Sequence, residues 1–273
     1  MPTALLRRAS RALGLLASGV LGALILAVTL GAATLPARAG GTDITAMTDA
    51  EREAFRREVR QYLLDNPEVI LEVIRLLEDR QRQAAAAHDA ALIAAHAKDL
   101  FDDGLSWVGG NPEGDVTVVE FLDYRCGYCR KAHPEVKALI EKDGNIRYIV
   151  KEFPILGEQS LASSRLAIAA LITAGPEVYA RLRDALMELD QPLTDALARA
   201  LLEDAGAPDP EAVLAARADP RVDAHIRRMH RLAQALRIEG TPGFVIGDRV
   251  IRGYVPGEQL AALVAEARKA AAR

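Results

Sequence analysis

The fold of this chain is decided by the stretch Val116-Thr117-Val118-Val119-Glu120-Phe121-Leu122 and by the cysteine motif that follows it, Cys126-Gly127-Tyr128-Cys129. The apolar run is rich in β-branched residues and predicts a buried strand. Residues 131–142 show a helical pattern that stops at Gly144, and glycine commonly ends helices. The two cysteines are therefore expected at the junction between a strand and a helix.

This position gives the cysteine pair its chemistry. The first backbone N–H groups of a helix lack partners and the helix dipole is positive there, so a thiolate is stabilised. Only the thiolate attacks a disulfide. The spacing of three places both sulfurs on one helical face, within bridging reach. We expect Cys126 to be the exposed nucleophile and Cys129 to be the resolving thiol that releases a mixed disulfide.

A structural zinc site is the alternative interpretation of the cysteines. Such a site needs about four ligands. The chain has 2 cysteines, and its 5 histidines fall in helical patterns without ligand spacing beside the motif. A Cys126–Cys129 bridge closes a loop too small to stabilise the fold much, so a purely structural disulfide is also disfavoured. We therefore expect a redox-active pair that needs no metal and no further cofactor.

A second element of the site is expected at Thr241-Pro242, which precedes a short apolar run over 244–246. Proline within a strand costs a ladder hydrogen bond and is confined to special positions. We predict a cis peptide bond here that faces Cys126, although X–Pro bonds are usually trans. The backbone of Thr241 would then pair with an extended substrate segment as an added strand. An ordinary turn proline is the alternative.

The remaining C-terminal sequence predicts a sheet interrupted by helices. Further strand patterns lie at residues 146–153, 244–246 and 249–253, with turns expected at Gly247-Asp248 and at Gly109-Gly110-Asn111-Pro112. Helical patterns fill 158–236 and 257–272. This order of elements predicts an α/β domain over 104–273. Its helical insertion, at about 157–237, is expected to cover the site as a lid.

A helical module is expected before this domain, over residues 40–103. Thr48 and Glu51 form a capping box near its start. Apolar residues recur at helical spacing on both sides of Asn66-Pro67, where the proline suits the first turn of a second helix. Residues 78–100 are rich in alanine and helix-prone, and we interpret them as a connector.

The N-terminal segment, residues 1–39, has the pattern of an export signal. Four arginines and no acidic residues flank an uncharged run over 12–37, which ends in the small-x-small pattern Ala37-Arg38-Ala39. An uncleaved anchor is the alternative, because the run exceeds the roughly 20 residues that span a bilayer. Both interpretations place the rest of the chain outside the cytoplasm, and a bacterial periplasm is the expected location.

The charge of the chain argues against a nucleic-acid partner. Removing the four arginines of residues 1–39 from the 34 basic residues leaves 30 basic against 38 acidic residues, a formal charge of −8. Nucleic-acid-binding domains usually have the opposite sign and a basic stripe. The sequence shows no such stripe, so no nucleic-acid partner is expected.

Together the motifs resemble the exported DsbA-like family of thioredoxin-fold proteins, and within it the ScsC type. The resemblance covers nearly all of 45–273. Its carrying stretches are Glu120-Phe121-Leu122-Asp123-Tyr124-Arg125-Cys126-Gly127-Tyr128-Cys129-Arg130, Lys151-Glu152-Phe153-Pro154, Gly240-Thr241-Pro242-Gly243-Phe244-Val245-Ile246-Gly247-Asp248 and Tyr62-Leu63-Leu64-Asp65-Asn66-Pro67-Glu68-Val69-Ile70. The resemblance implies a thioredoxin fold with a helical insertion, preceded by a helical oligomerisation module that often forms trimers.

The resemblance also implies roles for two further residues. Glu120 matches a family acid that helps move the proton of the buried thiol, and Lys151 matches its basic partner on the adjacent strand. A buried carboxylate should have a raised pKa and could accept that proton; a satisfied charge at a strand end is the alternative. Asp123 and Arg130 are expected to be solvated rim residues. The implied partners are cysteine-containing exported proteins and a membrane thiol reductant.

The dipeptide Gly127-Tyr128 resembles that of exported disulfide isomerases more than that of strong oxidases, as does Thr241 before the proline. We therefore expect a protein-disulfide isomerase or reductase whose substrates contact Gly127, Tyr128, Thr241 and Pro242. Many ScsC-like proteins carry proline at the position of Gly127, so the redox potential stays open. The alternatives are a monomeric dithiol oxidase and a copper-binding or chaperone-like protein, since two thiolates can hold Cu(I).

Overall fold

The computed structural model describes residues 44–272, so the expected export signal at 1–39 lies outside the described residues. The chain divides into two compact units between Asp65 and Asn66. In the first unit, helix α1 (Asp49–Asp65) begins with the predicted capping box. The Thr48 backbone N–H donates to the Glu51 carboxylate at 2.8 Å, and the Thr48 hydroxyl donates to it at 2.7 Å. The box thus satisfies polar groups that an uncapped helix leaves unpaired.

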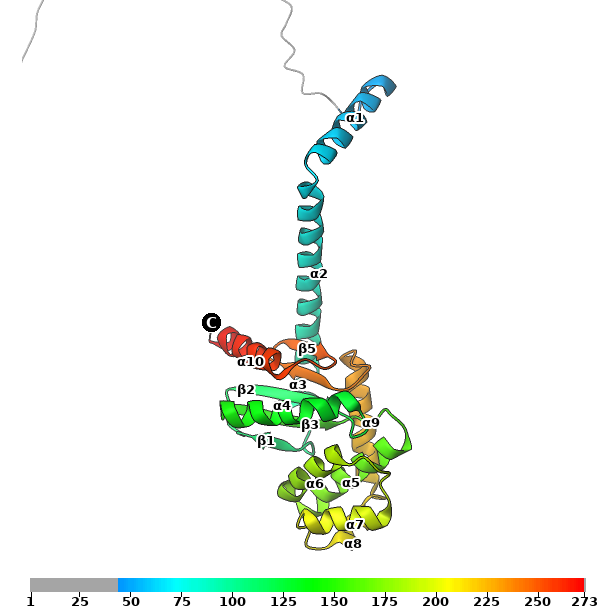
Figure 1. Cartoon of the computed structure of the whole chain (residues 1–273), viewed down its shortest axis with the longest axis vertical. Helices are drawn as coiled ribbons and strands as arrows, with labels where there is room; N and C mark the ends of the chain where they lie inside the picture. The colour runs from blue at the N-terminus through cyan, green and yellow to red at the C-terminus, as the bar shows by residue number, and fades with distance from the viewer. Residues whose placement is uncertain (1–43, 273) are drawn as a thin grey trace, which may run out of the picture. The chain divides into compact units, whose positions relative to one another are not determined.

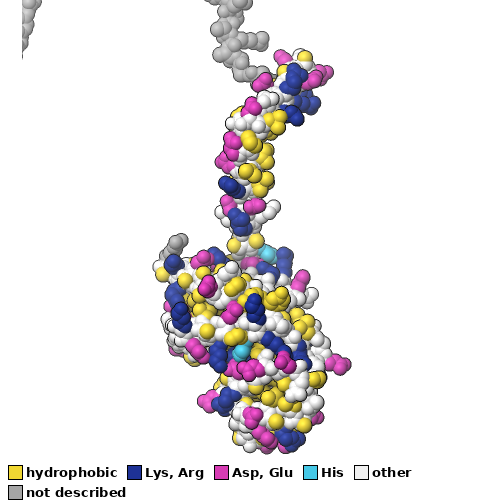
Figure 2. Space-filling view, viewed as in Figure 1, with side chains coloured by type: hydrophobic (Ala, Val, Ile, Leu, Met, Phe, Trp, Pro, Cys, Tyr) yellow, Lys and Arg dark blue, Asp and Glu magenta, His cyan; other side chains and the backbone are white. Residues whose placement is uncertain are grey.

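The second unit begins with helix α2 (Glu68–Ala95), directly after Asn66-Pro67. Most of α2 is exposed, and Figure 2 shows hydrophobic side chains along it. Its C-terminal end packs on the sheet, where Ile93 is buried and Asp89 forms an ion pair with Arg252. The last part of the expected module over 40–103 therefore belongs to the same compact unit as the sheet. Within residues 44–272, no helix has the length and apolar character needed to cross a bilayer.

The described part of the second unit contains a five-stranded mixed sheet (Figure 1). Its strands are β1 (Val108–Gly110), β2 (Val116–Leu122), β3 (Ile146–Glu152), β4 (Gly243–Ile246) and β5 (Arg249–Arg252). Their spatial order is β1-β3-β2-β4-β5, with β2 and β3 parallel and the other neighbours antiparallel. This is the thioredoxin-type α/β fold that the sequence predicts, and β2 has the expected bounds.

Strand β1 corrects one expectation, because Gly109 and Gly110 lie in a strand and not in a turn. They pair with Tyr148 and Arg147 of β3. At Gly110 φ is +66°, and a Cβ there would clash with the carbonyl oxygen of Ile146. These glycines allow the edge strand to approach β3 closely, a use of glycine that sequence patterns do not separate from a turn.

The sheet has two buried faces, because successive residues of a strand point to opposite sides. One face carries Val118, Tyr148 and Phe244, which form one core with Cys126 and Cys129. We call this the cysteine face. Its covering helices are α4 (Gly127–Asp143), α6 (Pro176–Glu188) and α10 (Gly257–Ala271).

The other face, which we call the opposite face, carries Val119, Phe121 and Ile149. Its covering helices are α3 (Ala97–Phe101) and α9 (Pro220–Ala235). Leu100 of α3 and Leu232 of α9 are buried in this core. The cysteine motif is therefore separated from α3 and α9 by the sheet.

The helical insertion between β3 and β4 contains α5 (Glu158–Ala174), α6, α7 (Asp195–Asp204), α8 (Pro210–Ala216) and α9. Figure 1 shows α5 to α8 gathered beside the sheet. The segment after α6 borders the cysteine motif, since Arg125 donates to the carbonyl oxygens of Leu189 and Gln191 at 2.9 and 3.1 Å. Helix α9 instead packs on the opposite face. Only part of the insertion therefore borders the cysteine motif, whereas the prediction was that the whole insertion covers it.

Candidate active site

Cys126 and Cys129 lie where β2 gives way to α4, as predicted. Cys126 is the N-cap residue with an extended backbone, and Cys129 lies in the first turn. Both are free thiols. Cys126 is 8% exposed and Cys129 is fully buried. The expectation of an exposed nucleophile is therefore wrong, because the loop at Thr241 lies against the Cys126 sulfur.

The surroundings of Cys126 lower the pKa of its thiol to about 5. The largest cause is a hydrogen bond from the Cys129 thiol, and burial opposes it. The Thr241 side chain and the backbone N–H groups of Cys129 and Tyr128 lower the pKa further. The helix start thus contributes as predicted, but the neighbouring thiol contributes more.

Cys129 has the opposite electrostatics. Burial raises the pKa of its thiol far above the usual range, and the hydrogen bond to Cys126 and the charge of Glu120 raise it further. A thiol in this state stays protonated until a nearby base accepts its proton. At neutral pH the pair therefore combines a thiolate at Cys126 with a thiol at Cys129.

The Thr241–Pro242 peptide bond is cis, as the sequence predicts. The Cys126 thiol donates to the Thr241 carbonyl oxygen at 3.1 Å, so this loop faces the cysteine as expected. The Thr241 hydroxyl is buried, helps to lower the pKa of Cys126, and has no other hydrogen-bond partner among the described residues. Thr241 therefore brings both a carbonyl and a hydroxyl to the nucleophilic sulfur.

Glu120 lies on the cysteine face and is 2% exposed. Its carboxylate accepts a hydrogen bond from the Tyr148 hydroxyl. Burial raises the pKa of Glu120, although that hydrogen bond and the charges of Arg183 and His133 act to lower it. The structure therefore places a buried carboxylate on the cysteine face, and its charge is one of the causes that raise the pKa of Cys129.

Lys151 is not the partner of Glu120, which corrects the prediction from the sequence. The register of β2 and β3 pairs Lys151 with Phe121, so its side chain points to the opposite face. There the Lys151 ammonium donates to the Asp103 carboxylate at 2.7 Å and to the Ser106 hydroxyl at 3.1 Å. The family resemblance matched the strand position correctly but not the side of the sheet.

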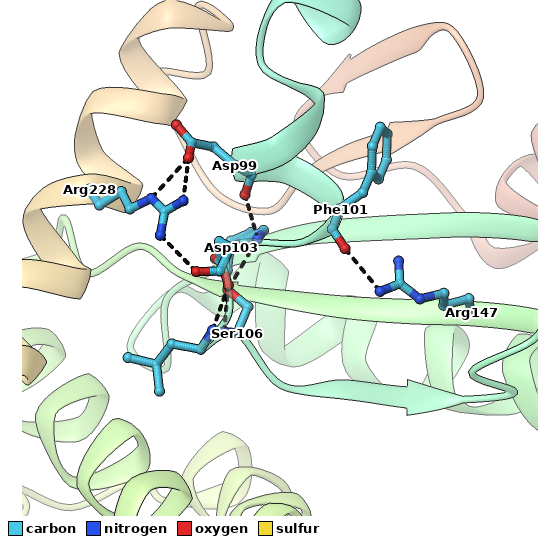
Figure 3. Close-up of polar contacts among 8 residues, drawn as sticks. Asp99, Phe101, Asp103, Ser106, Arg147 and Arg228 are labelled. Carbon is cyan, nitrogen blue, oxygen red and sulfur yellow. Dashed lines mark hydrogen bonds and ion pairs between the residues drawn. The ribbon is translucent and has the colours of Figure 1, made fainter.

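Figure 3 shows the polar cluster around Asp103 on this opposite face. The Asp103 carboxylate accepts the Ser106 N–H at 2.7 Å, and its carbonyl accepts from Arg228 at 2.8 Å. Arg228 also pairs with Asp99 of α3. Burial raises the pKa of Asp103, but the Lys151 charge and the hydrogen bonds from Lys151 and Ser106 together outweigh it and hold the pKa well below its usual range. This cluster is a fully paired network that joins α3, β3 and α9.

Asp123 and Arg130 are not solvated rim residues, contrary to expectation. Asp123 is fully buried and accepts the backbone N–H groups of Ile155 and Leu156 at 2.8 and 3.0 Å. Arg130 is partly buried and donates to the Tyr124 carbonyl oxygen at 2.9 Å. Both side chains therefore brace the backbone on either side of the cysteines.

Sequence reasoning missed a second buried carboxylate on the cysteine face, Glu152. It accepts hydrogen bonds from the hydroxyl groups of Tyr124, Tyr179 and Ser164 at 2.7, 2.6 and 2.7 Å. Burial raises the pKa of Glu152 to about 7, although these hydrogen bonds lower it. The sequence could have indicated this position, because side chains along a strand alternate between the two faces of the sheet. Glu152 lies four residues after Tyr148 on β3 and therefore points to the same face.

Arg183 and Tyr148 were also missed as neighbours of Glu120. Tyr148 lies on β3, where alternation could have placed it. Arg183 comes from α6 in the insertion, and its side chain is 7% exposed. No local pattern connects a residue of the insertion to the face of a distant strand.

Tyr128 presents an aromatic surface beside the cysteines. It is 63% exposed, and its ring stacks on that of Tyr254 with centroids 5.8 Å apart. The Lys131 ammonium lies 4.4 Å from the centroid of the Tyr254 ring. Gly127 is exposed, and a Cβ there would meet no neighbour within 4 Å. The surface next to Cys126 is thus open on the Gly127-Tyr128 side.

Residues 102–266 match the family model described as Thioredoxin, and residues 51–84 match the model described as the copper resistance protein ScsC N-terminal domain. Among solved structures, a thioredoxin-like oxidoreductase from Silicibacter pomeroyi DSS-3 is 41% identical with a TM-score of 0.59. That match covers 63% of this chain and 97% of the other.

Two further structures are similar. A periplasmic thioredoxin-like protein from Salmonella enterica serovar Typhimurium is 29% identical with a TM-score of 0.57, over 63% of this chain and 95% of that chain. Proteus mirabilis ScsC in a transitional conformation is 25% identical with a TM-score of 0.59, over 82% of this chain and 100% of that chain. The chain spans only 7% and 24% of the curated relatives it matches, the Na(+)/H(+) antiporters NhaA 1 of Salinispora arenicola and NhaA 3 of Salinispora tropica.

Proposed function

The chain belongs to the thioredoxin family of thiol–disulfide oxidoreductases, and from this premise we propose that it is a disulfide isomerase or reductase of the periplasm. Its proposed substrates are exported proteins that contain cysteines. The observation that carries the proposal is the placement of the two thiols: Cys126 caps the start of α4 beside the Thr241 carbonyl, and Cys129 is fully buried in the first turn. These surroundings lower the pKa of Cys126 to about 5 and raise the pKa of Cys129. An isomerase needs such a thiolate, because it must attack incorrect disulfides.

The reaction begins when the Cys126 thiolate attacks one sulfur of a substrate disulfide. A Cys126–substrate bond forms, the substrate S–S bond breaks, and the second substrate sulfur leaves as a thiolate. Another substrate thiolate then attacks the substrate sulfur of this mixed disulfide. A new substrate disulfide forms and Cys126 leaves as a thiolate, so the route rearranges disulfides without net oxidation or reduction.

In the reductive route, Cys129 resolves the mixed disulfide. Its thiol gives a proton to the Glu120 carboxylate, and its sulfur attacks Cys126. The substrate sulfur leaves as a thiolate, which takes a proton from water, and the Cys126–Cys129 disulfide forms, so two electrons pass to the substrate. A thiol reductant, which we propose to be membrane-bound, then reduces that disulfide. The raised pKa of Glu120 supports its role as the proton acceptor.

We assign substrate binding to the surface around Cys126. The Thr241 backbone beside the cis proline offers hydrogen-bonding groups to an extended chain, which would add to the sheet as a strand. The exposed Tyr128 ring offers an apolar contact, and Gly127 leaves room for the substrate next to it. These contacts are tolerant of sequence, which suits a protein that acts on many clients.

We assign oligomerisation to the apolar faces of α1 and α2. Exposed large hydrophobic residues include Phe55, Val59 and Leu64 on α1 and Ile70, Val73, Ile74 and Leu77 on α2. Exposed apolar patches of this kind usually mark interaction sites. These residues lie within the stretch 51–84 that matches the ScsC N-terminal model, and the family resemblance implies that this module forms a homo-oligomer such as a trimer. Several catalytic domains could then act on one misfolded client.

The proposed periplasmic location depends on residues 1–39, which lie outside the described residues. Their charge pattern and the Ala37-Arg38-Ala39 ending support an export signal that is cleaved. The similar Salmonella protein is described as periplasmic, which supports the same location here. Fractionation of expressing cells, with mass determination of the exported chain, tests both points.

Reactivation of scrambled ribonuclease A tests the proposed activity. We expect the reduced protein to restore ribonuclease activity without added oxidant, and Cys126→Ser to abolish this restoration. Cys129→Ser should keep part of the isomerase activity but lose reductase turnover, because the mixed disulfide no longer resolves internally. A protein that oxidises fully reduced ribonuclease quickly and leaves the scrambled form inactive would instead be a dithiol oxidase.

A truncation tests the role of the N-terminal helices. A chain that begins at residue 86 keeps Asp89 and Ile93, which contact the sheet, and lacks α1 and much of α2. We expect it to be monomeric by light scattering, to reduce a small disulfide at the full rate, and to reactivate scrambled ribonuclease more slowly. Full-rate reactivation by this monomer would contradict the proposed benefit of oligomerisation.

A second candidate function, Cu(I) binding, is favoured by the copper resistance description of the model that matches 51–84. Thiolate sulfur is a preferred Cu(I) ligand. In the described part of the chain, no group of three or more His, Cys, Asp or Glu side chains could hold a metal, so Cys126 and Cys129 are the proposed ligands. Competition with a Cu(I) chelator should show binding that Cys126→Ser removes.

A further inference from the structure

Two buried carboxylates lie close together on the cysteine face. Strand register pairs Glu120 of β2 with Val150 of β3, and Leu122 with Glu152. Glu152 is thus opposite the residue two positions after Glu120, and both point to the same face of neighbouring strands. Each of the two is 2% exposed. The proposed reaction uses Glu120 as the acceptor of the Cys129 proton and gives Glu152 no part.

A buried arginine connects these two carboxylates. The Arg183 guanidinium carbon lies 5.5 Å from the Tyr148 ring centroid, and the Tyr148 hydroxyl donates to Glu120. Tyr179 lies one turn before Arg183 on α6, and its hydroxyl donates to Glu152 at 2.6 Å. Burial is the main cause that raises the pKa of both carboxylates, and the Arg183 charge acts to lower both. One cation therefore acts on two buried acids.

The other charges near the pair are already engaged. The titratable and charged groups that surround it are Tyr124, Cys129, His133, Lys137, Tyr148, Tyr179, Arg183 and Asp184. Asp184 accepts from Arg183 at 2.9 Å, and Lys137 and His133 lie beside the same carboxylate at 2.9 and 3.2 Å. The two buried carboxylates therefore share the part of the Arg183 charge that Asp184 does not balance.

This sharing makes each carboxylate sensitive to the charge of the other. When Glu152 is ionised, it repels a second negative charge at Glu120 and takes part of the Arg183 interaction; when Glu152 is neutral, Arg183 acts on Glu120 alone. We propose that Glu152 is a positioning residue for the transfer of the Cys129 proton, because its charge state sets how tightly Glu120 holds that proton. The inference rests on the proposed function, in which Glu120 accepts the proton.

The charge of Glu152 changes in the neutral pH range, because burial raises its pKa to about 7. Above this range the ionised Glu152 makes Glu120 the stronger base, which favours removal of the proton from Cys129. Below it, Glu120 becomes the weaker base. The two carboxylates would thus adjust the resolving step to the pH of the surroundings.

Glutamine can replace Glu152 with little change in packing. The hydroxyl groups of Tyr124 and Tyr179 both donate to Oε1 of Glu152, and that of Ser164 donates to Oε2 at 2.7 Å. In a glutamine, Oε1 keeps both tyrosine hydrogen bonds, and Nε2 can donate to the Ser164 oxygen. Glu152→Gln therefore removes the charge and keeps the hydrogen bonds. Glu188→Gln, at an exposed position of α6, is the matched control.

The protonation of Glu120 can be measured directly, by carbon-13 NMR of the reduced protein with labelled glutamate carboxyl groups. The Glu120 signal is the one that Glu120→Gln removes. We expect its midpoint to lie at least about half a pH unit lower in Glu152→Gln than in the parent and to stay unchanged in Glu188→Gln. If Glu152→Gln does not fold, Tyr179→Phe, which removes a hydrogen bond to the ionised Glu152, should shift the midpoint in the same direction. An unchanged midpoint in the folded variant would overturn the proposal.

The resolving step gives a second measurement. In stopped-flow decay of a mixed disulfide, the pH at which the rate rises should be lower in Glu152→Gln and unchanged in Glu188→Gln. A purely structural role of Glu152 would lower stability without moving this pH. A parental profile that depends on Glu120 and does not move in Glu152→Gln would overturn this inference and leave the proposed function standing. A parent that resolves no mixed disulfide would contradict both.

Discussion

Each face of the sheet buries an ionisable residue, Lys151 on β3 and Glu120 on β2. The two residues differ in how completely their charge is paired. On the opposite face, Lys151 is matched by the Asp103 carboxylate and by further hydrogen bonds. On the cysteine face, Glu120 has a hydrogen bond from Tyr148 but no ion-pair partner in the described part of the chain. Burial alone therefore does not make a reactive group: a fully paired charge supports the fold, and a partly compensated one can exchange a proton.

Removing the Lys151 charge should produce the largest effect, and this effect should be a loss of stability without a loss of disulfide exchange. Lys151→Met leaves the buried Asp103 without its counter-ion, which should lower the free energy of unfolding by about 3–5 kcal/mol. Urea denaturation measures this loss. Lys142→Met, at an exposed position of α4, is the matched control and should change stability little.

The same variant also tests the correction of the Glu120–Lys151 pairing. Folded Lys151→Met should exchange disulfides at the parental rate, because its side chain points away from the cysteines. A folded variant with a strongly reduced exchange rate and unchanged stability would show that Lys151 acts in disulfide exchange. It would contradict the division of roles between the two faces.

Removing the Glu120 charge should produce the reverse pattern. Glu120→Gln takes away the proposed proton acceptor of Cys129, so we expect the resolving step to slow about 100-fold, or ~2.7 kcal/mol, with little loss of stability. Stopped-flow decay of a mixed disulfide measures the step across pH. The parental rate should rise as Glu120 ionises, above the usual carboxyl range, and this rise should be absent in Glu120→Gln. Exposed Glu141→Gln should keep it.

Glu152 gives a smaller, pH-dependent effect on the same face. Burial raises its pKa from 4.5 to about 7 in the folded protein, so the folded state binds more protons than the unfolded state between these values. Stability should therefore fall as pH rises from 5 to 8, by on the order of 2 kcal/mol. Glu152→Gln should flatten this part of the pH profile, and exposed Glu188→Gln should not. An unchanged slope in Glu152→Gln would show that another group titrates.

Local patterns predicted those parts of the fold and site that depend on neighbouring residues. Strand β2, the helix start at Cys126 and the cis bond before Pro242 each follow from a short stretch of sequence. The three-residue strand β1 was not predicted, because its glycines are typical of turns. Its place in the sheet depends on pairing with β3, which only the folded chain shows.

Partners across long sequence distances could not be predicted in the same way. Lys151 was assigned to Glu120 by resemblance, but strand register sends it to the other side of the sheet. Asp123 was expected in solvent, yet the chain after β3 returns to it with two N–H donors. Arg183 reaches the cysteine face from the insertion. In each case tertiary packing, and not local propensity, decides the surroundings of the charge.

The most direct test of the account is a titration of the Cys126 thiol, by its thiolate absorbance and its rate of alkylation, in the parent and in Cys129→Ala. The account predicts a parental midpoint near pH 5, and a clearly higher midpoint in Cys129→Ala because the largest stabilising hydrogen bond is gone. A parental midpoint near that of free cysteine, at about 8.5, would contradict the claim that the site holds Cys126 as a thiolate.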